Sequence, residues 1–155
     1  MGRVLLTVQR PDDAARAVRA AATHAAAGDC VFVVGIPPAL PVCAHWVGLT
    51  GVAHCPGLRD ELVEEVAGVV RATVEALPAS LGVEHRVAPG WRAQCMLDRI
   101  AAGCFDQVVL VSAPRRRRDR RELEQAALAG GARLVYWDGA PAVEPELPVV
   151  APAYA

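Results

Sequence analysis

The chain has little excess charge, no long hydrophobic run and no cysteine framework, and each of these absences excludes a class of protein. Its 155 residues include 16 basic and 17 acidic ones, which leaves a formal net charge of -1. Such a balance gives no general attraction to nucleic acid or to an anionic membrane, so any basic function must be local. The length fits one compact domain and is too short for two ordinary ones.

No apolar stretch reaches the length of a membrane-spanning helix, and the apolar run that begins at Val4 ends before Arg10 and Pro11. This run is too short for the hydrophobic region of a signal peptide, so we expect a cytoplasmic protein without a membrane partner. The five cysteines form an odd set without framework-like spacing. We therefore expect reduced thiols and no structural disulfide.

Short apolar runs alternate with longer amphipathic segments along most of the chain. The run at 30–35 is apolar on both faces, which is typical of a parallel strand covered by helices on two sides. We expect strands at 3–8, 30–35, 83–88, 105–111 and 134–137. We expect helices at 11–28, 58–77, 91–102 and 120–128, with stop signals at Gly28, Gly103, Gly130 and Gly131.

This alternation predicts an α/β fold with a doubly wound, five-stranded parallel sheet and helices on both faces. Ligands are expected where the carboxyl ends of the strands diverge at the switch point of the sheet. Residues 1–138 should form this domain, and residues 139–155 should form a proline-rich, irregular tail.

Segments 83–91, 95–103 and 105–111 resemble the universal stress protein pattern, in which a strand ends in glycine, a helix follows and another apolar strand comes next. The order and lengths of the expected elements match that family over residues 3–137. The resemblance implies an adenine nucleotide alpha hydrolase-like fold, a role in stress response and a homodimer joined through the last strand. The tail, which includes Val149 and Val150, could cover that strand edge instead.

ATP-binding members of that family carry an acidic residue just after the first strand and a G-x2-G-x9-G-(S/T) loop after the fourth. This chain has Gln9 at the first place and the sequence Val111-Ser-Ala-Pro-Arg-Arg-Arg-Arg-Asp at the second, where Pro114 lacks a backbone donor. We therefore expect no cofactor and no ordinary ATP binding. The chain also lacks a Walker sequence, a G-x-G-x-x-G and a G-x-S-x-G elbow, so the sequence specifies no covalent or phosphoryl-transfer catalyst.

An arginine-rich segment follows the fourth expected strand, with arginines at 115–118, 120 and 121. Beside a helix N-terminus these cations are unfavourable without a counter-anion. They indicate either a site for a phosphate, a carboxylate or an acidic protein surface, or a solvated charged turn partly balanced by Asp119, Glu122 and Glu124. Nucleic acid is not expected as a partner, because no recognition motif or stacking platform accompanies the arginines. The candidate ligand-binding residues are Gln9, Gly35, Ser112, Arg115, Arg116 and Arg118.

The long connection at 37–57 contains four possible metal ligands, Cys43, His45, His54 and Cys55. Their spacing matches no common zinc module, so packed thiols and imidazoles at the surface are the simpler interpretation. A Cys43–imidazole catalytic pair is a further possibility, although nothing in the sequence orients the base.

Four other aromatic or imidazole residues need an interpretation. Trp46 and Trp91 could line a site for a flat ligand, but aromatic residues at such positions more often pack in a core or an interface. His24 and His85 have no evident partners in the sequence, and we interpret both as structural.

We predict a dimeric, non-enzymatic regulatory or ligand-binding module in which an arginine-lined site or a protein contact replaces the ATP loop. One alternative is a small enzyme or accessory protein of specialised metabolism that uses the strand-end cleft, with the 37–57 connection shaping the pocket. Another is a metal-binding variant that uses the four candidates in that connection.

Overall fold

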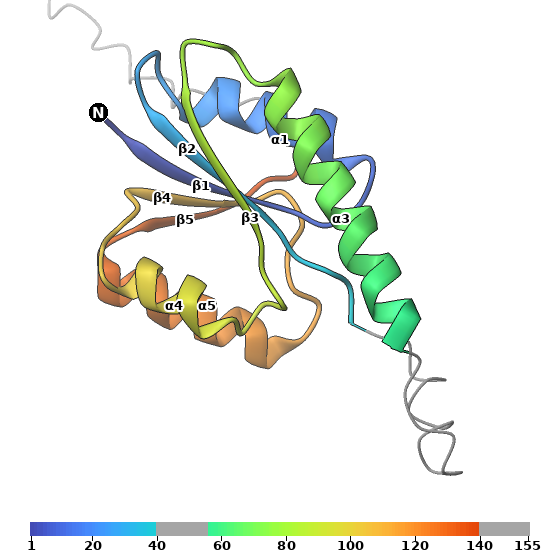
Figure 1. Cartoon of the computed structure of the whole chain (residues 1–155). Coiled ribbons are helices and arrows are strands. Elements are labelled where there is room, and N and C mark those ends of the chain that lie inside the picture. Colours follow the sequence, from blue (N-terminus) through green and yellow to red (C-terminus); the bar gives the residue numbers. More distant parts are fainter. Residues whose placement is uncertain (40–55, 140–155) are drawn as a thin grey trace, which may run out of the picture.

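The computed structural model describes residues 1–39 and 56–139, and in this part five strands alternate with four helices (Figure 1). The elements in chain order are β1 (Arg3–Val8), α1 (Asp13–His24), β2 (Cys30–Gly35), α3 (Pro56–Ala76), β3 (Gly82–Val87), α4 (Gln94–Ala101), β4 (Gln107–Leu110), α5 (Arg117–Gly130) and β5 (Arg133–Tyr136).

The five strands form one parallel sheet in the order β3-β2-β1-β4-β5. β1 lies at the centre and pairs with β2 on one side and β4 on the other, with Leu6 opposite Val33 and Val109. The chain therefore builds outward from β1 to β3 and then crosses back to build outward from β4 to β5. This order confirms the predicted doubly wound α/β fold and puts the switch point between β1 and β4.

Helices cover both faces of the sheet, and Figure 1 shows α1 and α3 on one side and α4 and α5 on the other. The alternation of side chains along β1 explains this layering, because Val4, Leu6 and Val8 face one core and Leu5 faces the other. Each core is closed by the apolar stripes of its own two helices. β1, β2 and β4 are buried on both faces and therefore read as continuous apolar runs in the sequence, whereas β3 and β5 at the sheet edges are more exposed.

Two glycines allow helices to approach other elements closely. A Cβ at Gly35 would lie 2.5 Å from a methyl of Val66, so α3 packs directly on the end of β2. A Cβ at Gly130 would lie 1.8 Å from the carbonyl oxygen of Ile100, so α5 packs even more closely against α4. Both positions need glycine for space rather than for backbone conformation.

Several element boundaries differ from the predicted ones. α5 begins at Arg117, three residues earlier than predicted, and ends at the left-handed Gly131, as its glycine signal indicated. α1 ends at His24 and does not reach Gly28, because Ala25 is extended with ψ 135°.

The expected tail lies outside the described residues from 140 onward. No helix of the described part combines the length and apolar composition that a membrane-spanning segment needs.

Candidate functional site

A cleft of about 370 Å³ opens at the carboxyl ends of the strands, beside the switch point of the sheet. The β1–α1 turn contributes Gln9 and Arg10, the β4–α5 turn contributes Arg115 and Arg116, and the turn before α4 contributes Trp91. Because every strand is parallel, all of these turns emerge at one edge of the sheet. We call this hollow the switch-point cleft.

Two carboxylates share the switch-point cleft with the arginines. Glu65 comes from α3 and Asp119 from the first turn of α5, and both side chains line the cleft. The apolar part of the wall includes Pro38 and Val66. Three arginines and two carboxylates therefore line a partly apolar hollow, and the excess of arginines suits a small molecule carrying an anionic group.

A buried carboxylate fixes the two turns on either side of the switch point. Asp13 in the first turn of α1 is fully buried, and one of its oxygens accepts bonds from the backbone N–H groups of Gln9 (2.8 Å) and Arg10 (2.9 Å). The same oxygen accepts a bond of 2.6 Å from the Ser112 hydroxyl at the end of β4. Asp13 thus joins the β1–α1 turn to the strand that precedes the arginines.

Further bonds extend this network to β1 and β5. The Thr7 hydroxyl donates to the backbone oxygen of Ser112 at 3.0 Å. Arg16 forms an ion pair of 3.3 Å with Asp13 and also donates to the backbone oxygen of Trp137 at 3.1 Å. Since Ser112 is buried and its hydroxyl is used by Asp13, its role in this structure is to hold the carboxylate.

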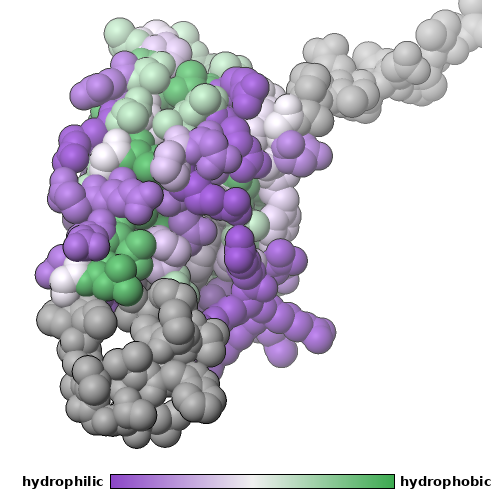
Figure 2. Space-filling model, turned by 90° about the vertical axis from the view of Figure 1, so that its right-hand side faces the viewer, coloured by the Kyte–Doolittle hydropathy of each residue, from purple (hydrophilic) through white to green (hydrophobic). Residues whose placement is uncertain are grey.

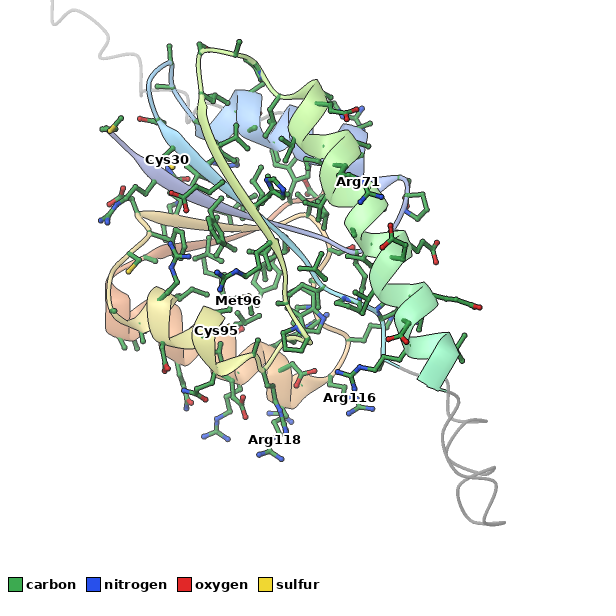
Figure 3. The ribbon with its side chains drawn as sticks, viewed as in Figure 1. Cys30, Arg71, Cys95, Met96, Arg116 and Arg118 are labelled. Carbon is green, nitrogen blue, oxygen red and sulfur yellow. The ribbon has the colours of Figure 1, made fainter. Side chains whose placement is uncertain are left out.

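The arginine-rich segment divides into two groups. Arg115 and Arg116 line the switch-point cleft. The helical arginines line a separate, open hollow of about 780 Å³, and we call them the α5 arginine group: Arg117, Arg118, Arg120 and Arg121. In Figure 3, Arg118 projects from α5 away from the sheet, whereas Arg116 lies between the start of α5 and α3. Arg120 also lines the hollow that contains Ser112, together with Arg10 and Arg115, so a third hollow adjoins both groups.

Contacts within the α5 arginine group are local. Arg118 pairs with Glu122 one turn later at 3.2 Å, and the Arg120 side chain donates to the backbone oxygen of Pro114 at 2.8 Å. These are ordinary helix-surface and turn contacts, and the Arg118 pair is exposed enough for solvent to weaken it.

The structure brings together some of the candidate ligand-binding residues and separates others. Gln9, Arg115 and Arg116 line the switch-point cleft, and Ser112 lies in an adjoining hollow beside Arg115. Gly35 lies under α3 and does not line the cleft. Sequence reasoning did not include Asp13 among the candidate residues.

The other residues singled out in the sequence have varied surroundings. Trp91 is half-buried against the core between the sheet and helices α4 and α5, and it also lines the cleft. The same side chain therefore packs in the core and forms part of the pocket wall. His24 is 3.2 Å from the side-chain oxygen of Gln107 and packs edge-on against Trp137, so it has the partners that the sequence did not reveal. His85 is exposed on β3.

The candidates in the 37–57 connection, Cys43, His45, Trp46, His54 and Cys55, lie outside the described residues. Within 1–39 and 56–139, no group of three or more His, Cys, Asp or Glu side chains is arranged to hold a metal ion.

Tyr136 and Asp29 have shifted pKa values, and both lie away from the switch-point cleft. Burial raises the pKa of Tyr136, and its hydrogen bond to Glu124 adds to the rise, so its hydroxyl remains a donor. Bonds from the backbone N–H groups of Ala26 and Gly2 lower the pKa of Asp29 at the opposite edge of the sheet.

No protein-family model matches the chain, and no curated protein is significantly similar to it.

Proposed function

We propose that this protein binds a small anionic ligand in the switch-point cleft and acts as a regulatory or ligand-binding module of the universal stress protein type. The observation that supports this function is the convergence of Arg10, Arg115 and Arg116 on one hollow at the switch point. Doubly wound folds bind their ligands at this place, and guanidinium groups bind phosphate and carboxylate with paired hydrogen bonds.

The network around Asp13 supports a binding role because it holds the cleft in a defined shape. The turn with Arg10 and the end of β4, just before Arg115, are tied to one buried carboxylate. A site that is already formed loses little conformational entropy when the ligand binds.

Ordinary ATP binding is not part of this proposal. In the family that the chain resembles, a glycine-rich loop after the fourth strand surrounds the phosphates with backbone donors. Here the corresponding segment contains the buried Pro114, which has no backbone donor and whose oxygen accepts a bond from Arg120. Side-chain guanidinium groups replace backbone N–H groups as the anion donors.

Two further features belong to the proposal. We propose a homodimer through the outer edge of β5, which pairs with no strand among the described residues and leaves Tyr136 45 % exposed. We also propose a cytoplasmic location, because Cys30, Cys95 and Cys104 are free thiols, as in a reducing compartment. Sedimentation equilibrium should give the mass of two chains, and the mass of one chain would contradict the dimer.

Thermal unfolding in the presence of inorganic phosphate, pyrophosphate, AMP, ATP and citrate tests the binding function. A ligand at about 100 times its Kd stabilises the native state by about 2.7 kcal/mol, which for a chain of this size raises Tm by about 5–10 °C. We expect at least one anion to give such a rise, and the Arg115→Gln/Arg116→Gln variant to lose it.

The matched control removes two arginines of the same segment that lie outside the cleft. Arg117→Gln/Arg121→Gln changes the net charge equally and should keep the ligand-dependent rise. If none of the anions raises Tm, the proposed function is wrong. A rise that survives the cleft variant and disappears in the control would place binding on α5 instead.

A further inference from the structure

A second hollow of about 510 Å³ adjoins the switch-point cleft along the same edge of the sheet, and we call it the outer hollow. The two hollows share part of their walls, including Pro38, Trp91 and Arg116. The two hollows therefore adjoin at the carboxyl ends of the strands, and we call the pair the groove. Figure 2 views the molecule from the side of α3 and shows a mainly hydrophilic face with only small apolar areas.

The two ends of this groove each carry their own pair of arginines. Arg10 and Arg115 line the switch-point cleft and not the outer hollow, whereas Arg59 and Arg92 line the outer hollow and not the cleft. Trp91 lines both hollows. Each hollow therefore has its own pair of arginines, and the two hollows share one aromatic side chain.

The two arginines of the outer hollow lie near helix N-termini, where the helix dipole is positive and a cationic side chain is unfavourable. Arg59 lies in the first turn of α3, and Arg92 lies two residues before α4. Neither helix has an acidic residue in its first turn, where negative charge is favourable. The outer hollow is also lined by Arg116 and by one carboxylate, Asp119, so its three arginines outnumber its acidic side chains. An anion there would balance the remaining positive charge.

The geometry points to an elongated ligand with two anionic groups, phosphate or carboxylate, joined by a flat or apolar segment. Arg10 and Arg115 hold one anion in the switch-point cleft, and Arg59 and Arg92 hold the other in the outer hollow. The connecting segment packs on Trp91 and Pro38. This inference rests on the proposed function, because the cleft binds one anionic group of the ligand and the outer hollow binds the other.

Calorimetric titration with methylphosphonate and with a series of alkane bisphosphonates of increasing chain length tests the inference. Methylphosphonate should bind the cleft weakly. Bisphosphonates too short to reach both arginine pairs should bind at most about twofold more tightly than methylphosphonate, because either of their two phosphonate groups can occupy the cleft. One chain length should bind at least about tenfold more tightly, because the second contact is then intramolecular. A matched dicarboxylate series shows which of the two anions the groove prefers.

Arg59→Gln/Arg92→Gln should abolish the bisphosphonate gain and leave methylphosphonate affinity within about twofold of the parent protein. Arg19→Gln/Arg133→Gln removes the same charge from two exposed positions outside both hollows, and it should keep the gain. If methylphosphonate binds but no bisphosphonate gains affinity, or if the gain persists without Arg59 and Arg92, the inference is wrong while the proposed function stands. If no probe binds, both are wrong.

Discussion

Replacing Asp13 with asparagine should destabilise the fold strongly, because one buried oxygen of Asp13 accepts three hydrogen bonds. The donors are the Ser112 hydroxyl at 2.6 Å and the backbone N–H groups of Gln9 at 2.8 Å and Arg10 at 2.9 Å. The other oxygen faces Arg16 at 3.3 Å. An asparagine can place its oxygen toward the three donors only by turning its NH₂ group toward that guanidinium.

The magnitude follows from these contacts. The variant loses an ion pair that is largely buried and weakens three charge-assisted hydrogen bonds, each worth about 1.5–3 kcal/mol in full. Because asparagine keeps a neutral acceptor, we expect a loss of about 3 kcal/mol in the free energy of unfolding. For a chain of this size that lowers Tm by about 6–12 °C.

Urea denaturation followed by circular dichroism measures the loss directly, provided that the m-value is unchanged. The control is Asp12→Asn at the neighbouring, exposed aspartate, whose side chain makes no capping bond to α1. It should change stability by no more than about 0.5 kcal/mol. If Asp13→Asn costs less than about 1 kcal/mol, Asp13 does not hold the two turns together as we argue.

Three further variants test other parts of the structure. Gly130→Ala should lower stability by more than about 2 kcal/mol in urea denaturation, because the new Cβ would lie 1.8 Å from the Ile100 oxygen; a neutral effect would contradict the close α4–α5 packing. Arg117→Gln should raise stability by about 0.3–1 kcal/mol at low salt, because Arg117 opposes the α5 dipole, and a loss would refute that argument. The Ala26 N–H holds the pKa of Asp29 below its ordinary value of 3.8, so the Asp29 carboxylate adds stability above that value and loses it as the pH falls through the folded-state pKa. Asp29→Asn should therefore be less stable than the parent at pH 7, with a difference that shrinks in acid; a difference independent of pH would contradict the shift.

Much of the fold could be predicted from local patterns. The apolar runs of β1 and β2 are buried on both faces, so they appeared as strands with the same bounds as in the structure. The stop of α5 was predicted because Gly131 takes the left-handed conformation that closes a helix. The start of α5 was placed too late, because the arginines from Arg117 onward oppose the helix dipole and resemble a turn.

The candidate site was harder to predict because its main contacts connect distant parts of the chain. Ser112 and Asp13 are 99 residues apart, so no local pattern could pair them. One local signal was present, because Asp13 bonds to the backbone of Gln9 and Arg10, and an aspartate shortly after a strand is typical of such turns. The outer hollow was not predicted either, since Arg59 and Arg92 are far apart in the sequence and line the same hollow only in the folded chain.

The central claim is that the switch-point cleft binds an anion, and a crystal structure with tungstate tests it most directly. Tungstate is a tetrahedral oxyanion like phosphate, and its anomalous scattering identifies each bound ion without ambiguity. The account predicts an anomalous peak within hydrogen-bond distance of the Arg115 and Arg116 guanidinium groups. A peak only on the α5 arginine group, or no peak at saturating tungstate, would contradict it.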